Sequence, residues 1–459
     1  MAVAAAPLTR LAGELSGTLL TPENPEYVDC RLPFLARLDE RLPQVVVRAA
    51  TAADVRAGLA FARAHRLDVA VRSGGHSFAD RCSTDGLLLD LGGLRQLRTD
   101  GDLVTAGPGL RMRELRRRLA TGGRTVSAGW CPDVGLGGAV LGGGYGSLSR
   151  LYGLGSDHLV AAEVVLADGR TVWCDTDREP DLFWALRGAG GGLLGVVTTF
   201  VLRTRPTVPA TFFECRWPVR HAADVIGTWL GWAPEAPDEI NCESVLIGPH
   251  DPADEPYVAV FGMSVGAGTG FLDRFAPDPE HVEIRELPAP AAAAVSYPES
   301  PDDLEVTGPP WGTSAGRRLC RSEFFDQPLP PDTVTALVQH LVAGRTAAGQ
   351  SRELEFIPWG GAYGRVAPHA TAFVHRRARF ILRHTGYAIR RTTDAVRQDT
   401  RRWVDRSWAI AHPWGSGLIY PNYPEPDRSP LDPTYHGANL DRLRRIVTRY
   451  DPDAVFAHG

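Results

Sequence analysis

The sequence predicts an α+β protein with two parts, and three observations lead to this expectation. Residues 43–100 alternate between short apolar strands and a helix, which is the pattern of a βαβ unit. Hairpin and strand patterns continue to residue 205, and the pattern changes character after Pro206. A chain of 459 residues is also long enough for two domains.

The first part opens with a strand at 45–48 and a helix from its N-cap, Thr51, to about His65. Asp168 and Gly169 form a typical hairpin turn. A helix over 110–119 carries a run of arginines that we interpret as a solvated face: Arg113, Arg116, Arg117 and Arg118. The remaining expected elements are strands at 69–72, 87–91, 161–167, 171–174 and 195–202 and a short helix at 181–187.

The second part is less periodic. Residues 287–311 are rich in proline and alanine and are expected to form a surface loop. Strands are expected near 353–357 and 372–375. From Tyr435 the tail is expected to form one amphipathic helix that ends at Asp451.

Composition excludes several classes of function. The net charge of −5 gives no electrostatic reason to bind nucleic acid or an anionic membrane. All 49 basic residues are arginines, so a lysine Schiff base is excluded. The seven cysteines are scattered and form no Cys-x-x-Cys motif, which argues against a disulfide scaffold or a metal site. With no signal peptide pattern and no membrane-length apolar run, we expect a cytoplasmic protein.

Two glycine-dense runs each contain one nucleophile. His76 lies in Arg-Ser-Gly-Gly-His-Ser (72–77), and Cys131 lies in Trp-Cys-Pro-Asp-Val-Gly-Leu-Gly-Gly (130–138). A third run, Leu-Gly-Gly-Gly-Tyr-Gly, spans 141–146. Glycine lets the main chain approach a large planar ligand. A nucleophile in such a loop is a candidate for covalent attachment of a cofactor, and two nucleophiles suggest two attachment points.

Common nucleotide and hydrolase motifs do not fit these runs. None is a Gly-x-Gly-x-x-Gly between a strand and a helix with an acid about 20 residues further on. A P-loop requires a lysine, which the chain lacks. The chain also has no Gly-x-Ser-x-Gly elbow with credible triad partners.

Nine segments, taken in order, carry a family resemblance. They span 71–77, 131–138, 141–146, 152–154, 181–188, 195–198, 359–362, 420–423 and 451–452. Together they resemble the berberine-bridge-enzyme-like FAD-linked oxidases of the vanillyl-alcohol-oxidase and p-cresol-methylhydroxylase superfamily. The resemblance implies a two-subdomain FAD-binding domain from residues 1–205 with a C-terminal return over 410–459. It also implies a substrate domain over 206–409, built on an antiparallel sheet flanked by helices.

The resemblance implies a bicovalent FAD, with His76 joined to the 8α-methyl carbon and Cys131 to C6 of the flavin ring. Val134 takes the position where a small side chain leaves dioxygen access to the flavin, which favours an oxidase. The remaining residues implied to bind FAD are Arg72, Ser73, Gly74, Gly75, Ser77, Gly138, Gly142, Gly143, Gly144, Gly146, Val196, Tyr420 and Asn422.

Tyr423, the second tyrosine of Tyr-Pro-Asn-Tyr, matches the catalytic base of the family. An ordinary tyrosine has a pKa near 10, so this base needs positive neighbours or hydrogen bonds. Glu355 is either an assistant to Tyr423 or an exposed strand acid. Alkaloid-cyclising relatives carry a glutamate base at the position that Leu382 occupies here, which argues against that reaction.

The expected function is oxidation of an alcohol or hemiacetal on a sugar, glycoside or polyketide-like secondary metabolite. FAD accepts the hydride and dioxygen reoxidises it to give hydrogen peroxide. The alternatives are oxidative cyclisation or desaturation on the same scaffold, a dehydrogenase with another electron acceptor, and a flavin-binding protein without turnover. The expected partners are a small-molecule substrate and dioxygen.

Overall fold

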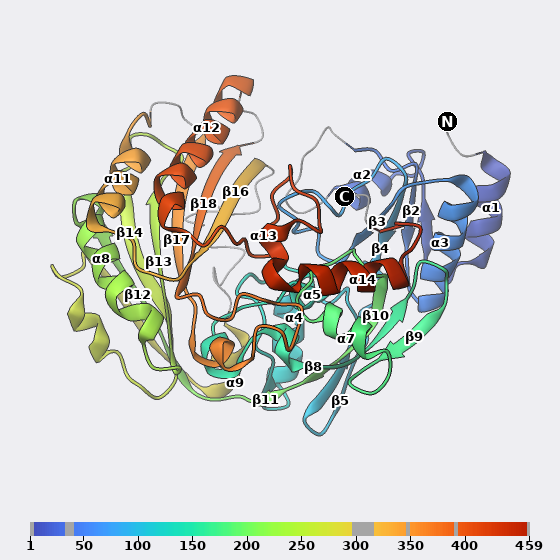
Figure 1. Cartoon of the computed structure of the whole chain (residues 1–459), viewed down its shortest axis with the longest axis horizontal. Helices are drawn as coiled ribbons and strands as arrows, with labels where there is room; N and C mark the ends of the chain where they lie inside the picture. Colours follow the sequence, from blue (N-terminus) through green and yellow to red (C-terminus); the bar gives the residue numbers. More distant parts are fainter. Residues whose placement is uncertain (1–3, 33–40, 296–315, 346–348, 390–392, 457–459) are drawn as a thin grey trace.

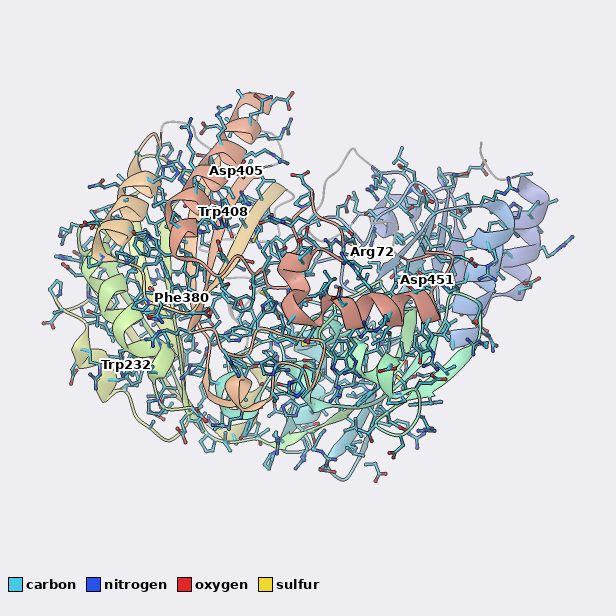
Figure 2. The ribbon with its side chains drawn as sticks, in the orientation of Figure 1. Arg72, Trp232, Phe380, Asp405, Trp408 and Asp451 are labelled. Carbon is cyan, nitrogen blue, oxygen red and sulfur yellow. The ribbon has the colours of Figure 1, made fainter. Side chains whose placement is uncertain are left out.

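The computed structural model describes residues 4–32, 41–295, 316–345, 349–389 and 393–456. Helices and sheets are mixed, and two parts lie side by side (Figure 1). Trp232 and Phe380 belong to one part, whereas Arg72 and Asp451 belong to the other (Figure 2). The α+β prediction is therefore confirmed. The division at residues 205 and 409 stays a prediction. Among the helices of the described ranges, none has the length and apolarity needed to cross a membrane.

The first part begins with a four-stranded sheet in the order β1-β2-β4-β3. β2 (Val45–Arg48) and β3 (Val69–Arg72) both pair in parallel with β4 (Leu87–Asp90), and α3 (Ala52–His65) connects them. Thr51 caps α3 as predicted, because its hydroxyl accepts a hydrogen bond from the backbone N–H of Asp54. β3 ends at Arg72 and leads directly into the loop that carries His76.

A five-stranded antiparallel sheet follows in the order β5-β6-β10-β8-β9, and the predicted hairpin joins β8 to β9. Its strands are β5 (Leu97–Asp100), β6 (Leu103–Ala106), β8 (Leu159–Val165), β9 (Thr171–Cys174) and β10 (Val196–Arg203). The shorter elements of this part are α1 (Ala5–Glu14), β1 (Thr18–Leu20), α2 (Tyr27–Arg31), α4 (Met112–Ala120), β7 (Arg124–Thr125), α5 (Leu136–Leu141), α6 (Ser149–Tyr152), α7 (Pro180–Leu186) and β11 (Arg205–Pro206).

The second part is one seven-stranded antiparallel sheet in the order β15-β12-β14-β13-β17-β18-β16. Helices α8 (Ala222–Trp232), α11 (Pro331–Val342) and α12 (Asp394–Ala411) cover its outer face (Figure 1). The strands are β12 (Ala210–Pro218), β13 (Ile240–Gly248), β14 (Tyr257–Ser264), β15 (His281–Leu287), β16 (Gly316–Phe325), β17 (Gln350–Pro358) and β18 (Phe380–Ile389).

The two faces of this sheet differ because successive side chains of a strand point to opposite sides. Leu354 and Phe356 of β17 pack with Trp229 of α8 in an apolar cluster. Full burial of each such side chain contributes about 1.5–3 kcal/mol. Glu353 and Glu355 therefore face the first part of the molecule, and both are buried there. The apolar face packs against the helices, and the opposite face carries the charged side chains.

The C-terminal tail returns to the first part, where Leu443 and Ile446 join its core. The predicted single helix is wrong in one respect, because it is interrupted between α13 (Pro433–His436) and α14 (Leu440–Tyr450). Gly437 has a φ of 46°, a left-handed conformation that a continuous right-handed helix cannot contain. α14 then crosses the first part (Figure 1).

Two other predictions need correction. Residues 372–375 form no strand, because the backbone N–H groups of Ala372 and Phe373 bond to the carbonyls of Trp184 and Arg187 at the end of α7. Within the expected 287–311 loop, the alanine-rich stretch forms helix α9 (Ala289–Ala294), consistent with the high helix propensity of alanine. The remainder of that loop, from residue 296, lies outside the described residues.

A buried ion pair ties the two parts together. Arg376 donates to both carboxylate oxygens of Asp157, at 2.7 and 2.9 Å, and its side chain has no exposed surface. A bidentate pair of this kind fixes both orientation and distance.

We expect Arg376→Met to lower the free energy of unfolding by about 3–5 kcal/mol, because it leaves the largely buried Asp157 carboxylate without its cation. Arg170→Met breaks an exposed pair with Asp168 and is expected to cost about 0–1 kcal/mol. Urea denaturation followed by circular dichroism measures both values. Equal losses in the two variants would contradict the role of the Arg376 pair.

Candidate active site

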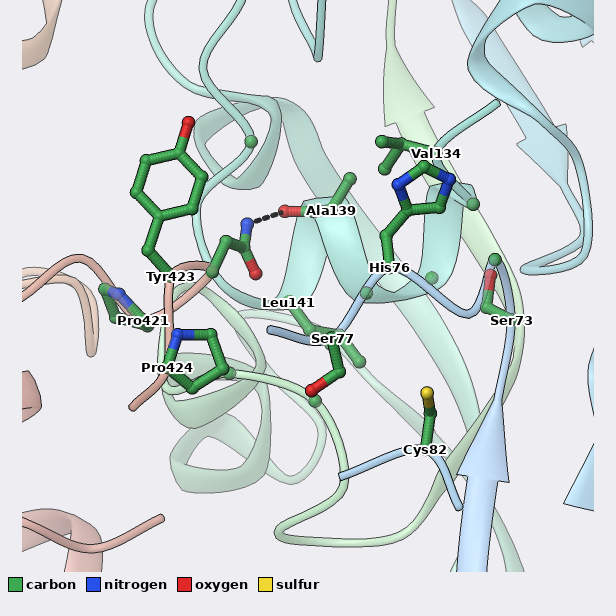
Figure 3. Close-up of a pocket in the computed structure, with 18 of the residues that line it drawn as sticks. Ser73, His76, Ser77, Cys82, Val134, Ala139, Leu141, Pro421, Tyr423 and Pro424 are labelled. Atoms are coloured by element: carbon green, nitrogen blue, oxygen red, sulfur yellow. Dashed lines mark hydrogen bonds between the residues drawn. The ribbon is translucent and has the colours of Figure 1, made fainter. Parts of the chain in front are cut away.

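A single cavity lies between the glycine loops of the first part and the charged face of the seven-stranded sheet. His76, Cys131 and Tyr423 all line it, although they are far apart in the sequence. Figure 3 shows His76 beside Val134 on one side of the cavity and Tyr423 above Pro421 and Pro424 on the other. The prediction placed these three residues at one site, and the structure brings them to one cavity.

The loop with His76 and the loop with Cys131 touch each other at two glycines. A Cβ on Gly74 would lie 2.2 Å from the backbone nitrogen of Gly135, and a Cβ on Gly135 would lie 2.2 Å from the Ser73 hydroxyl oxygen. Real Cβ atoms do not approach other atoms so closely, so only glycine permits this contact. The contact brings both nucleophiles to the same cavity.

His76 is held as a neutral imidazole. Burial, as the largest cause, and the nearby charges of Arg111 and Arg318 together lower its pKa to about 3, against a hydrogen bond with the Asp133 backbone that raises it. A neutral imidazole keeps a nitrogen lone pair, which nucleophilic attack requires.

Cys131 has exposed surface and lines the cavity, while the surrounding protein still removes most of its solvent. This burial raises the pKa of the thiol, and the positive charges of Arg383 and Arg318 oppose the rise. Arg116 secures the loop by donating to the carbonyls of Gly129 and Trp130, at 2.7 and 3.0 Å. The interpretation of the arginine run as a solvated face is therefore wrong for Arg116, which is buried.

Tyr420 and Asn422 anchor the segment before Tyr423. The Tyr420 hydroxyl accepts a hydrogen bond from the Gly144 backbone at 3.0 Å. The Asn422 amide donates to the Ala139 carbonyl at 3.0 Å (Figure 3) and to the Tyr420 hydroxyl at 3.2 Å. The third glycine run is thus bonded to the Tyr-Pro-Asn-Tyr segment, which fixes where Tyr423 stands.

The Tyr423 hydroxyl has two polar contacts. It lies 2.5 Å from the Tyr145 hydroxyl and accepts a hydrogen bond from Arg383 at 3.3 Å. The Arg383 guanidinium also lies 5.1 Å from the centre of the Tyr423 ring. Burial raises the pKa of Tyr423 well above its ordinary value, and Arg383 opposes that rise. Arg383 is the positive neighbour that a tyrosine base requires.

Two buried carboxylates hold Arg383 in place. Its guanidinium donates to Glu353 and pairs with Glu355, at 2.6 and 2.8 Å. Burial raises the pKa of Glu355 to about 8. Glu243 accepts from the indole N–H of Trp130 at 2.6 Å, and burial raises its pKa to about 7. Glu355 is therefore a buried cavity acid, and its interpretation as an exposed strand acid is wrong.

Four predicted residues do not line the cavity. The Arg72 side chain is buried elsewhere and donates to the carbonyls of Cys30, Arg31 and Cys82. The others are glycines where a Cβ would strike neighbouring groups: Gly142 against Asn422, Gly143 against Phe373 and Gly146 against Gly129. The predicted residues that line the cavity are Ser73, Gly74, Gly75, His76, Ser77, Cys131, Val134, Gly138, Gly144, Val196, Glu355, Tyr420, Asn422 and Tyr423.

Sequence reasoning missed Arg383, Arg318, Glu243 and Tyr145, all of which line the cavity. The alternation of side chains along β17 could have indicated part of this cluster. Once Glu353 and Glu355 are placed on one face of β17, the pairing of Glu355 with Arg383 follows from the strand register. The register itself depends on the fold.

The cavity suits an FAD molecule in shape and chemistry. It continues from Tyr423 past the two nucleophiles to the glycine-rich segment 190–193 and to Val196. A Cβ on Gly138, in the first turn of α5, would meet no atom within 4 Å and would project into open space. A flat or phosphorylated ligand can therefore approach the main chain there.

Comparisons with known proteins support FAD binding. A family model described as FAD binding domain matches residues 43–175, and one described as berberine and berberine like matches residues 419–459. The chain is 29% identical to an uncharacterised FAD-linked oxidoreductase of Bacillus subtilis, with 96% of each chain covered. It is 28% identical to xylooligosaccharide oxidase of Thermothelomyces thermophilus, over 92% of this chain and 88% of that protein.

Among solved structures, BBE-like 1 of Physcomitrella patens matches with a TM-score of 0.83 and 24% identity, over 98% of this chain and 97% of that one. This match shows that the mixed helix-and-sheet fold is shared with that protein. By these matches the protein is an FAD-linked oxidoreductase, and it is similar to the berberine-bridge-enzyme-like proteins over nearly its whole length. The resemblance predicted from the sequence is confirmed.

The buried carboxyl of Glu355 makes stability depend on pH. Its folded-state pKa of about 8 lies above the ordinary value of 4.5, so its contribution is complete below pH 4.5 and is lost as the pH rises through about 8. We expect Glu355→Gln to reduce the fall in melting temperature between pH 5 and pH 8, as measured by differential scanning fluorimetry. Glu283→Gln, at a more exposed position of the same sheet, is the control. Identical pH profiles for Glu355→Gln and the wild type would contradict this assignment.

Proposed function

We propose that the protein is an oxidase whose FAD is joined covalently to His76 and Cys131. Its substrate is an alcohol or hemiacetal of a sugar, glycoside or polyketide-like secondary metabolite. The observation that carries this proposal is that two nucleophiles from separate glycine loops and a tyrosine beside a guanidinium line one cavity. We retain a cytoplasmic location as a prediction.

Each covalent attachment replaces one C–H bond of the flavin. His76 forms a C–N bond with the 8α carbon, and Cys131 forms a C–S bond with C6. Each step releases two electrons and two protons, one proton from the side chain and one from the flavin carbon. One dioxygen molecule per bond accepts them and becomes hydrogen peroxide. The neutral state of His76 supports the first of these steps.

The main chain and short side chains of the two loops would hold the cofactor. Ser77 and Gly75 of the first loop line the cavity, and Gly138 at the start of α5 provides open main chain on the other side. Arg72 would act at a distance, by fixing the end of β3 through its carbonyl contacts. FAD supplies a two-electron acceptor for hydride and returns the electrons to dioxygen.

Tyr423 would remove the proton from the substrate hydroxyl. Loss of its own proton beforehand places a negative charge on the phenol oxygen, next to the Arg383 guanidinium and the Tyr145 hydroxyl. Both groups stabilise that charge and oppose the burial, which still raises the pKa of Tyr423 above its ordinary value. Glu355 assists as a positioning residue, because it pairs with Arg383.

The cavity wall formed by the seven-stranded sheet supports a substrate rich in oxygen. Glu243, Glu355, Arg318 and Arg383 all line the cavity. These groups provide both donors and acceptors, which suits hydroxyl groups better than an apolar alkaloid surface. The relatives include a xylooligosaccharide oxidase, and a structural neighbour is a chitooligosaccharide oxidase.

The alternatives differ in their products. Oxidative cyclisation in relatives uses a glutamate base where this chain has Leu382, and Leu382 packs in the helix-covered core. A dehydrogenase would retain a reduced flavin in air, whereas Val134 lines the cavity where a small side chain favours dioxygen access. Stopped-flow reoxidation of the reduced protein with air-saturated buffer separates an oxidase from a dehydrogenase.

The covalent link predicts a mass change that survives unfolding. The denatured wild-type chain should be heavier than the polypeptide by one FAD and stay yellow after acid precipitation. His76→Ala and Cys131→Ala should each retain colour through the remaining bond, and only the double variant should lose it. Release of intact FAD from the unfolded wild type would disprove the double linkage.

Replacement of the base should slow turnover without removing FAD. We expect Tyr423→Phe to lower kcat by about 10²–10⁴-fold, because it removes the group that accepts the proton. Hydrogen peroxide release is measured with xylo-oligosaccharides, chito-oligosaccharides and benzylic alcohols. Tyr257→Phe on β14 is a control whose residue lies outside the cavity lining. A Tyr423→Phe variant as active as the wild type would exclude Tyr423 as the base.

A further inference from the structure

Arg111 joins the His76 loop to the Cys131 loop. One guanidinium nitrogen of Arg111 donates to the carbonyl of Gly74 at 2.6 Å and to the carbonyl of Asp133 at 2.8 Å. Gly74 lies two residues before His76, and Asp133 lies two residues after Cys131. A single cation therefore binds the main chain beside each proposed attachment point.

The backbone around Arg111 already fixes one of the two loops. Arg111 forms an isolated bridge with Gly135. The N–H groups of Met112 and Arg113 bond to the carbonyls of Val134 and Pro132 at 3.0 and 2.9 Å. The start of α4 is thus bonded to the Cys131 loop through the main chain. The Arg111 side chain extends this rigid unit to the His76 loop.

The His76 loop has a second side-chain contact, which is a weaker type of hydrogen bond. The hydroxyl of Ser73 donates to the carbonyl of Pro108 at 2.6 Å, which is a hydrogen bond between neutral groups. The bonds from Arg111 are charge-assisted, and such bonds are roughly twice as strong. Within the described residues, Arg111 has no carboxylate within ion-pair distance, so both of its close partners are these carbonyls.

The charge of Arg111 also acts on His76. Positive charge from Arg111 lowers the pKa of the imidazole, in the same direction as burial. The groups around His76 are Arg111, Arg318 and the Asp133 backbone. Arg111 therefore favours the neutral, nucleophilic form of His76 while it fixes the loop.

We propose that Arg111 is a positioning residue for the covalent attachment of FAD, because it sets the distance between the two loops that provide the attachment points. This inference rests on the proposed bicovalent linkage. Two bonds to one rigid ring require both nucleophiles to reach their carbons together, and small misplacements of reacting atoms reduce rates steeply. Arg111 itself forms no bond to FAD and exchanges no electrons.

The test compares the state of FAD in purified full-length variants. Arg111→Met removes the charge and both hydrogen bonds, and we expect the fraction of chain with both bonds to fall by about tenfold. Proteolytic peptide mapping measures that fraction, through one flavin that joins the His76 and Cys131 peptides. Total flavin in the native protein, measured by absorbance, should fall less than the doubly linked fraction. If Arg111→Met is not recovered folded, Arg111→Gln replaces it with the same expectation.

Two further variants make the outcome specific. Arg111→Lys keeps the charge and the donors, and we expect it to recover at least half of the doubly linked fraction. Arg113→Met removes an arginine of the same turn whose side chain pairs, among the described residues, with the Asp133 carboxylate at 3.7 Å. Its doubly linked fraction should equal that of the wild type. Three results would each overturn the inference. They are a wild-type doubly linked fraction in Arg111→Met, an equally large fall of that fraction in Arg113→Met, and no recovery of it in Arg111→Lys. Absence of the double link in the wild type would instead refute the proposed function.

Discussion

The contact between two glycine loops is the constraint on which the site depends. Gly74 and Gly135 approach so closely that no side chain fits between them. Their contact places His76 and Cys131 on one cavity although 54 residues separate them in the chain. Any larger residue at either position would separate the loops, and the two nucleophiles would no longer face the same ligand. The close approach of the two loops therefore depends on glycine at both positions.

The seven-stranded sheet completes the site through its alternation of side chains. The face that packs on α8, α11 and α12 is apolar, and this packing stabilises the sheet. The opposite face can then carry Glu353, Glu355 and Arg383 without loss of that core. Arg383 pairs with both carboxylates at under 3 Å and so opposes the desolvation of these charges, although burial still raises the pKa of Glu355. The same network also reaches Tyr423.

Local signals predicted much of the fold and part of the site. The cap at Thr51, the βαβ order and the Asp168–Gly169 hairpin depend on neighbours in sequence, and each was predicted correctly. Arg116 and Glu355 were misjudged because their burial depends on segments far away in the chain. Residues 372–375 look like a strand, but their hydrogen bonds go to the end of α7. Contacts between segments that are far apart in the chain determine these structures, and a single sequence does not reveal such contacts.

The same distinction explains why motifs identify the cofactor better than the substrate. Each glycine run can be recognised from its local sequence, because close backbone approach to a ligand requires glycine at fixed spacing. The proposed substrate wall is assembled from single residues on β13, β16, β17 and β18, each flanked by residues of the opposite face. No contiguous motif records that wall. Its two arginines and two acids come together only through strand register, so substrate choice can change by single substitutions while the flavin site stays intact.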